Sequence, residues 1–193
     1  MRKIISITLF VSFLLPLPAV ADECTAGDCR NGHGTLVFDT GHKYTGRFED
    51  GVRQGEGILL MPGGRKIVGV WEDNQIKSGT YTESDGTVYE GQWEFDERNG
   101  QGALTFPDGR KYIGEFKSNQ RHGQGTMLFP DGRKYVGDFS SGKRTGRGTM
   151  AYPDGRTYTG EFKDGEISGQ GTMTYSDGKK KEGSFKNGKY VGN

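Results

Sequence analysis

One pattern of 23 residues recurs through most of this chain and constrains its fold more than any other feature. Four consecutive copies read YEGQWEFDERNGQGALTFPDGRK, YIGEFKSNQRHGQGTMLFPDGRK, YVGDFSSGKRTGRGTMAYPDGRT and YTGEFKDGEISGQGTMTYSDGKK, and they begin at Tyr89, Tyr112, Tyr135 and Tyr158. Self-similarity at a fixed period of this length is typical of stacked-repeat proteins.

The same pattern extends in both directions from these copies. Residues 44–66 form another full copy, and residues 32–43 match the second half of one. Residues 67–88 form a degenerate copy, which is one residue shorter and carries Ile67 in place of the tyrosine. Residues 181–193 begin a last copy that we expect to contain only the first strand of its hairpin.

Each copy predicts a β-hairpin. Apolar and polar positions alternate in 112–116 and again in 123–129, and a period of two residues indicates strands. Pro130-Asp131-Gly132 is a turn signal, whereas residues 117–122 predict a longer polar connection. Because an isolated hairpin is marginal in water, neighbouring hairpins must pair. The predicted fold is all-β: an elongated, single-layer antiparallel meander of stacked hairpins.

The alternation places aromatic rings and glycines on one face of this sheet. We expect the glycines to leave sockets that rings of adjacent strands enter. A single layer leaves the ring face without a cover, so the sheet curls around it, two copies cover each other, or a ligand lies there. The candidate interaction face comprises Tyr44, Phe48, Trp71, Tyr81, Tyr89, Trp93, Tyr112, Phe116, Tyr135, Phe139, Tyr158, Phe162 and Phe185. The degenerate copy predicts a bend or a distinct surface centred on Trp71 and Tyr81.

The pattern Y-x-G-x-F…G-x-x-x-G-x-G…D-G resembles the MORN (membrane occupation and recognition nexus) repeat, from Gly32 to Asn193. The resemblance implies a rod of paired strands and a role in scaffolding, protein association or phospholipid binding. Some members of that family carry a lipid kinase or a methyltransferase domain beside the repeats. Neither domain is found here, so the resemblance implies no activity.

Residues 1–21 have the pattern of a secretory signal peptide, with Arg2 and Lys3 before an apolar run and Ala19-Val20-Ala21 as a cleavage site. The run is shorter than the ~20 apolar residues of a spanning helix, which disfavours a membrane anchor. The expected location is the periplasm or the exterior of the cell. Loss of two basic residues with the leader changes the net charge from +1 to −1, so no long-range attraction to nucleic acid is expected.

The predicted mature chain has an N-terminal edge segment, residues 22–31, followed by one repeat domain, residues 32–193. Both cysteines, Cys24 and Cys29, lie in the edge segment. Export to an oxidising compartment favours a disulfide between them, and its expected role is to hold the first edge of the sheet. A zinc site is disfavoured because only His33 is nearby and a structural site needs four ligands.

No catalytic, metal or cofactor site is predicted, since the three histidines lie in different copies and the repeated aspartates precede glycine in turns. Basic residues follow the same turn in successive copies and would align into a ladder with ~10 Å between rungs. Its members are Arg65, Lys66, Arg110, Lys111, Arg133, Lys134, Arg156, Lys179 and Lys180. The ladder suits a polyanion, but neighbouring aspartates can offset its charge.

Two function classes remain from the sequence. The first is a non-enzymatic exported scaffold that binds a protein partner or itself. The second is a binder of anionic lipid headgroups or envelope polysaccharide, through the ladder or the ring face.

Overall fold

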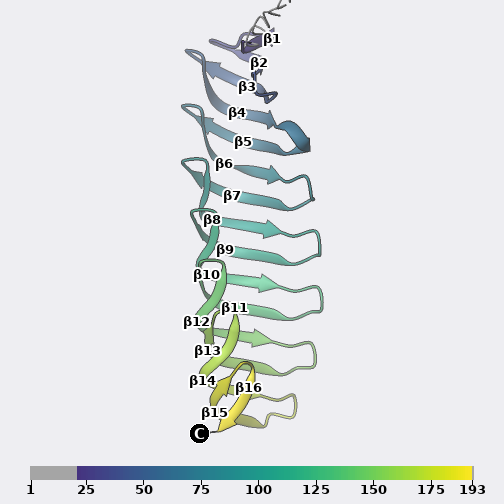
Figure 1. Ribbon diagram of the computed structural model, residues 1–193, viewed down its shortest axis with the longest axis vertical. Coiled ribbons are helices and arrows are strands. Elements are labelled where there is room, and N and C mark those ends of the chain that lie inside the picture. The colour runs from purple at the N-terminus through teal and green to yellow at the C-terminus, as the bar shows by residue number, and fades with distance from the viewer. Residues whose placement is uncertain (1–20, 193) are drawn as a thin grey trace, which may run out of the picture.

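The computed structural model describes residues 21–192, which form one antiparallel sheet of sixteen strands in chain order, β1 to β16. The hairpins stack into a long column whose strands run across its axis (Figure 1). This is the predicted all-β meander. The predicted signal peptide lies outside the described residues, apart from its last position. No helix within residues 21–192 is long and apolar enough to cross a membrane.

The strand bounds follow the repeat, with two strands to each copy. The strands are β1 Glu23–Gly27, β2 His33–Val37, β3 Lys43–Glu49, β4 Val52–Leu60, β5 Lys66–Glu72, β6 Gln75–Thr82, β7 Val88–Glu94, β8 Glu97–Thr105, β9 Lys111–Lys117, β10 Gln120–Leu128, β11 Lys134–Ser140, β12 Lys143–Ala151, β13 Thr157–Lys163, β14 Glu166–Thr174, β15 Lys180–Lys186 and β16 Lys189–Gly192. A short 3-10 turn, Pro62–Gly64, lies between β4 and β5.

The connection within each hairpin is shorter than the sequence predicts. In the copy that begins at Tyr112, only Ser118 and Asn119 lie between β9 and β10, and both have positive φ, 45° and 66°. Two left-handed residues make the tight turn whose twist matches that of the flanking strands. The prediction of a long polar loop over 117–122 is therefore wrong, because β10 begins at Gln120.

The turns between hairpins are built by aspartate, as the sequence predicts. The side chain of Asp131 accepts a hydrogen bond from the backbone N–H of Arg133 at 3.0 Å, and Asp108 and Asp154 do the same two residues ahead. Those hydrogen bonds, made to the ionised carboxylate, hold the pKa of Asp131 below its usual value. The repeated aspartates thus have a structural role.

The two glycines of each Gly-x-Gly pair have different structural roles. Gly123 has φ +54° at a bulge, where the register between β9 and β10 shifts. Gly125 pairs with Gly114, and a Cβ on Gly125 would lie 2.6 Å from Cζ of Tyr112. Only Gly125 is therefore the predicted socket; Gly123 supplies a backbone conformation that bends the strand.

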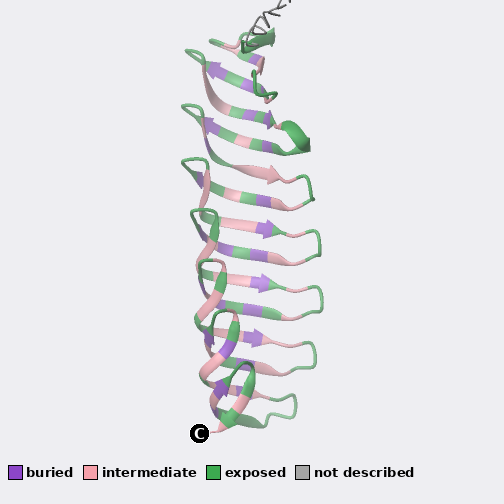
Figure 2. Ribbon diagram, in the orientation of Figure 1, coloured by how far each residue is buried: buried purple, intermediate pink, exposed green. Residues whose placement is uncertain are grey.

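The socketed tyrosines form the core together with the rings beside them. Tyr112 is fully buried and contacts Phe116 and Phe139 edge to face, with ring centroids 5.2 and 4.9 Å apart. Its hydroxyl donates to the carbonyl of Glu115 at 2.8 Å. Each such contact contributes about 1 kcal/mol beyond the area it buries. Purple segments mark the buried positions along each hairpin (Figure 2).

Of the three ways expected to cover the ring face, the structure shows the first: the sheet curls over its own rings, and they cover one another. Tyr81 is half-buried, and the other residues of the candidate interaction face are at most 9% exposed. These residues are Tyr44, Phe48, Trp71, Tyr81, Tyr89, Trp93, Tyr112, Phe116, Tyr135, Phe139, Tyr158, Phe162 and Phe185.

Both ends of the sheet differ from a plain repeat. At the first edge, Cys24 and Cys29 form the expected disulfide, and Cys24 lies in β1, which pairs with β2. At the last edge, β16 pairs with β15, so the prediction that residues 181–193 lack a second strand is wrong. The ring of Tyr190 lies 5.4 Å from that of Phe185 and covers the end of the core.

Replacing Gly125 with alanine tests the socket. The new Cβ would overlap the Tyr112 ring, so we expect the free energy of unfolding to fall by about 3 kcal/mol. Gly178→Asn is the control, because Gly178 has φ +82° with no atom near its Cβ position and asparagine tolerates that conformation. Denaturant unfolding of both variants checks this; equal losses would contradict the socket.

The buried tyrosines predict alkaline unfolding. Burial raises the pKa of Tyr89, Tyr112 and Tyr135 to about 12, against ~10 in an unfolded chain. Their contribution to stability is therefore complete below pH ~10 and is lost as the pH rises towards 12. Tyr112→Phe should lower stability at neutral pH but make its decline from pH 10 to 12 shallower. An unchanged slope in denaturant titrations would contradict this prediction.

Candidate functional site

Four arginines occupy the same place in their copies and form what we call the arginine column: Arg53, Arg98, Arg121 and Arg144. Each lies near the start of the second strand of its hairpin and is half-buried. The guanidinium of Arg121 lies 5.9 Å from the Tyr112 ring centroid and 5.8 Å from that of Phe139. The column therefore runs beside the ring core from one hairpin to the next.

Each arginine also holds the turn of the following hairpin. The guanidinium of Arg121 donates to the carbonyl of Gly142, and the N–H of Gly142 donates to the carbonyl of Arg121 at 3.0 Å. Arg144 and Gly165 make the same pair of bonds. We call this reciprocal contact the turn clip. It fixes the guanidinium groups at the spacing of the repeat.

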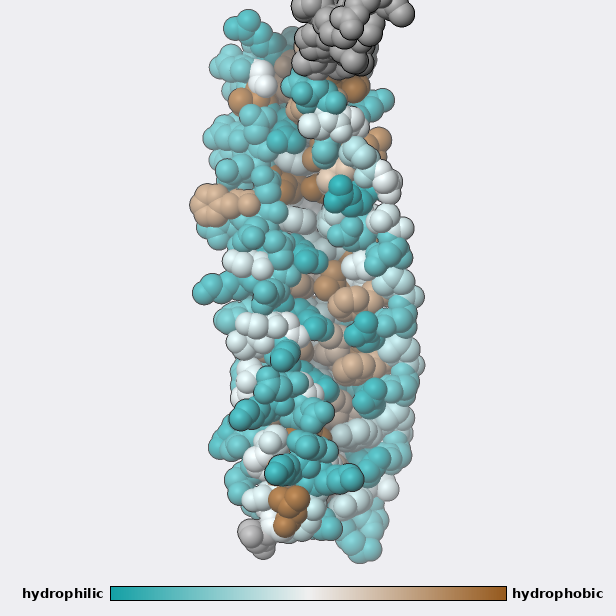
Figure 3. Space-filling view, in the orientation of Figure 1, coloured by the Kyte–Doolittle hydropathy of each residue, from teal (hydrophilic) through white to brown (hydrophobic). Residues whose placement is uncertain are grey.

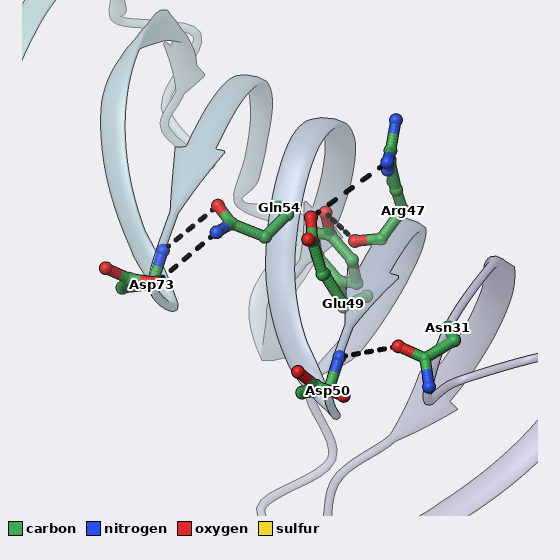
Figure 4. A network of polar contacts seen from close by, with 7 residues as sticks. Asn31, Arg47, Glu49, Asp50, Gln54 and Asp73 are labelled. Carbon is green, nitrogen blue, oxygen red and sulfur yellow. Dashed lines mark hydrogen bonds and ion pairs between the residues drawn. The ribbon is translucent and has the colours of Figure 1, made fainter.

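Side chains add to these links at the first turns (Figure 4). The N–H of Asp50 donates to the side-chain oxygen of Asn31 at 2.9 Å. The N–H of Asp73 donates to the side-chain oxygen of Gln54 at 3.2 Å, and the amide of Gln54 donates back to the Asp73 carboxylate. The turn ends of the hairpins are thus joined along the column.

The column is cationic, and its members form no ion pairs. Within the described residues, none of the four lies within ion-pair distance of a carboxylate. Asp96 and Glu166 act on the charges of Arg53 and Arg144 from farther away. Burial lowers the pKa of Arg121, and the neighbouring Arg110 and Arg144 lower it further. Loss of hydration and like charge both raise the energy of these cations. An anionic group beside them would relieve both effects.

A hollow of about 210 Å³ lies between Arg121 and Arg144, lined also by Arg110, Lys143 and Phe129. No acidic residue lines it. In space-filling view, hydrophobic residues follow the middle of this face between hydrophilic margins (Figure 3). We call this strip of rings and column arginines the groove. It combines stacking surfaces with unpaired donors, which is what an extended acidic segment needs.

The predicted outer ladder lies next to the column. Arg110, Arg133 and Arg156 each pair with the aspartate two residues before them at 2.7 Å, and Lys179 pairs with Asp177 at the same distance. Arg110 and the column's Arg121 both lie against the ring of Phe106. Arg110, Arg133 and Arg156 of the ladder are thus paired with aspartates, whereas the column's arginines form no such pairs.

The sequence analysis missed the column because it placed these residues in a loop. A signal was available: arginine stands at the same offset in four copies, and isoleucine replaces it at Ile76 and Ile167. No group of three or more metal-ligating side chains is found among residues 21–192.

The degenerate copy interrupts the groove. Its Ile67 and Ile76 replace a core tyrosine and a column arginine, and a cavity of about 420 Å³ opens between β5–β6 and β7–β8. Trp71, Tyr81 and Trp93 line this cavity. The surface expected around Trp71 and Tyr81 is therefore a pocket, which we call the interruption pocket.

A comparison with protein-family models matches more than half of the chain to the MORN repeat. The matched segments are 30–43, 44–64, 89–109, 112–132, 135–155, 158–180 and 182–193. The chain belongs to the MORN repeat family. The matched MORN repeats bracket the interruption pocket, since no matched segment falls within 65–88.

A solved structure with low sequence identity shares the fold of this MORN-repeat chain. This structure is the TCP domain of SAS-4 (dCPAP) of Drosophila melanogaster in complex with a proline-rich motif of Ana2 (dSTIL). It has a TM-score of 0.54 and 13% identity, and the alignment covers 95% of this chain and 97% of that one. Another, the G-box domain of the microcephaly protein CPAP, has a TM-score of 0.44, 16% identity and coverage of 79% and 80%. No curated protein matches the chain.

Proposed function

We propose that this chain is a non-enzymatic, exported scaffold that associates with a protein partner, and that the groove holds an extended acidic segment of that partner. One observation carries the proposal: the column's arginines are half-buried, regularly spaced and without carboxylate partners. The location is proposed from the signal-peptide pattern of residues 1–21.

Guanidinium N–H groups of the column that donate no hydrogen bond support a ligand-binding role rather than a purely structural one. Among the described residues, the guanidinium of Arg121 donates a single hydrogen bond, to the Gly142 carbonyl, although a guanidinium carries five N–H donors. Carboxylates accept such donors in pairs, with charge-assisted bonds stronger than those between neutral groups. Because the protein's net charge is near zero, this attraction is local to the groove.

The likeness to the TCP domain is consistent with this proposal. That domain shares the fold and is described in complex with a peptide motif of another protein. A single-layer sheet of this length offers a long continuous surface, which suits an extended segment better than a compact ligand.

A second candidate is binding of anionic lipid headgroups or envelope polysaccharide by the outer ladder. The alignment of Arg110, Arg133 and Arg156 favours it, since each follows an equivalent turn. The paired aspartates weaken it, because each of these three arginines already has a carboxylate at 2.7 Å.

Two sets of variants separate these candidates in the chain from residue 22 onwards. Arg121→Ile with Arg144→Ile uses isoleucine, which two other copies carry at this position as Ile76 and Ile167, so we expect the fold to persist. It should reduce recovery of the protein partner from envelope extract at least tenfold. The matched control, Arg156→Gln with Lys179→Gln, removes the same number of cations from ladder positions that do not line the hollow and should leave recovery unchanged.

Liposome co-sedimentation with anionic vesicles completes the comparison, at low and high salt. Salt-sensitive vesicle binding that the ladder variant abolishes, without recovery of a protein partner, would overturn the proposal in favour of the second candidate. Full recovery by the column variant would exclude the groove as the site.

We also propose that the chain self-associates through β16, the last strand of the sheet, whose outer edge pairs with no other described strand. Such an edge recruits strands of other molecules, and a two-fold dimer would satisfy both copies. Sedimentation at tens of micromolar should show a dimer for residues 22–193 and a monomer for residues 22–188. A monomer in both cases would contradict the dimer, and a dimer in both would place its interface elsewhere.

A further inference from the structure

The column loses an arginine at Ile76, and several other departures from the repeat coincide there. The N–H of each equivalent turn residue donates to the carbonyl of the column position before it, for example Asn119 to Arg98 at 3.1 Å. Within the described chain no such bond joins Asp96 to Ile76. Among the equivalent turns of the described chain, the turn that follows the interruption pocket is therefore the one without this backbone bond, and we call it the unclipped turn.

The missing tyrosine also interrupts the row of ring contacts between neighbouring copies. Elsewhere a tyrosine contacts the ring of its own copy and that of the next, as Tyr89 contacts Trp93 and Phe116 at 5.2 and 5.0 Å. Ile67 cannot bridge Trp71 to Trp93 in this way. Instead, the Ile76 side chain reaches the socket, and a Cβ on Gly69 would lie 2.7 Å from its Cδ1. The remaining space is the interruption pocket.

Two tryptophans form walls of the pocket. Trp71 and Trp93 line the cavity, and they are 2% and 9% exposed. Their indole nitrogens are buried within the protein and have no hydrogen-bond partner there. The pocket therefore presents ring surfaces, which favour an apolar side chain.

The unclipped turn carries an exposed ring. Phe95 is 73% exposed and has φ +51°, and Asp96, which lines the cavity, has φ +59°. A bulky residue in the left-handed region is strained, and strain of this kind gathers at functional sites. Phe95 thus presents a large apolar surface next to the pocket.

We propose that the interruption pocket is the anchor site of the groove and selects a partner segment with one apolar residue in register with acidic ones. The apolar side chain enters between Trp71 and Trp93. This inference rests on the proposed function, because it assumes that the groove binds an extended segment.

The repeat sets the spacing of the partner's residues. Two strands per copy advance the column by ~9.6 Å. An extended segment in the polyproline II conformation rises ~3.1 Å per residue with three residues per turn, so every third side chain lies on the same face. One copy therefore corresponds to about three partner residues. Acidic residues at every third position would face Arg53, Arg98, Arg121 and Arg144, with the apolar residue facing Ile76.

Synthetic peptides test this pattern against the chain from residue 22. The probe has glutamate at every third position, one leucine in place of the second glutamate, and serine elsewhere; the reversed sequence covers the opposite direction. A control replaces the leucine with serine, and another keeps the composition but shifts the leucine by one position. We expect the probe, in one direction, to bind at least tenfold more tightly than either control.

A matched variant of the protein restores the tyrosine and the arginine of the regular copies at the interruption pocket. Ile67→Tyr with Ile76→Arg refills the pocket with the residues of the other copies, so the fold should persist, and Ile76→Arg alone is the fallback. We expect the preference for leucine to vanish while the glutamates still bind. Arg121→Ile with Arg144→Ile should do the opposite, with weaker binding overall and the leucine preference retained.

The outcomes separate the anchor from the proposed function. Equal binding of probe and controls, lost in the arginine variant, would overturn the anchor and leave the acidic groove standing. Absence of binding by every peptide would overturn the anchor, while capture of a partner by the unaltered protein would still support the scaffold. A dimer that the refilled variant abolishes would assign the pocket to a second copy of the chain and overturn the proposal.

Discussion

In each regular copy, the structure depends on the fit of the first tyrosine ring against the second glycine of the Gly-x-Gly pair. In the copy that begins at Tyr112, the ring lies over Gly125 and its hydroxyl reaches the backbone of the same hairpin. A side chain on that glycine would displace the ring, and without the ring the single layer would have no core. Burial of the hydroxyl among backbone carbonyls raises the pKa of these tyrosines, so the core holds only while they stay protonated.

Because the core is linear, each hairpin depends on its neighbours rather than on a second layer. The rings alternate between residues of one copy and the next, and the turn clips repeat that connection at the edge of the sheet. A repeat of this kind can change one copy without unfolding the rest. The copy at 67–88 shows the result: its two isoleucines remove a ring and a cation, and strands β5 and β6 still pair in register.

The electrostatic character of this protein's surface depends on where each charge lies rather than on the net charge. The outer arginines are matched by aspartates of their own turns, which satisfy the turn and the cation together. The column's arginines instead lie against rings and bond to neutral carbonyls, and within the described residues no ion pair offsets their charge. The two sets share rings such as Phe106, and this proximity gives the groove its cationic character.

The repeat period, the alternation and the aspartate–glycine turns determined the hairpins, their order and the face on which the rings lie, because these are local properties of the chain. Only the tertiary structure decided that the rings are buried by one another, since that depends on how far the bulge at Gly123 bends each hairpin. It also decided which cations remain unpaired: Arg110 and Arg121 look alike in sequence, but only Arg110 follows a turn that supplies a carboxylate. The interruption pocket is likewise a tertiary property, because its walls come from adjacent copies and only their stacking brings Trp71 and Trp93 to one cavity.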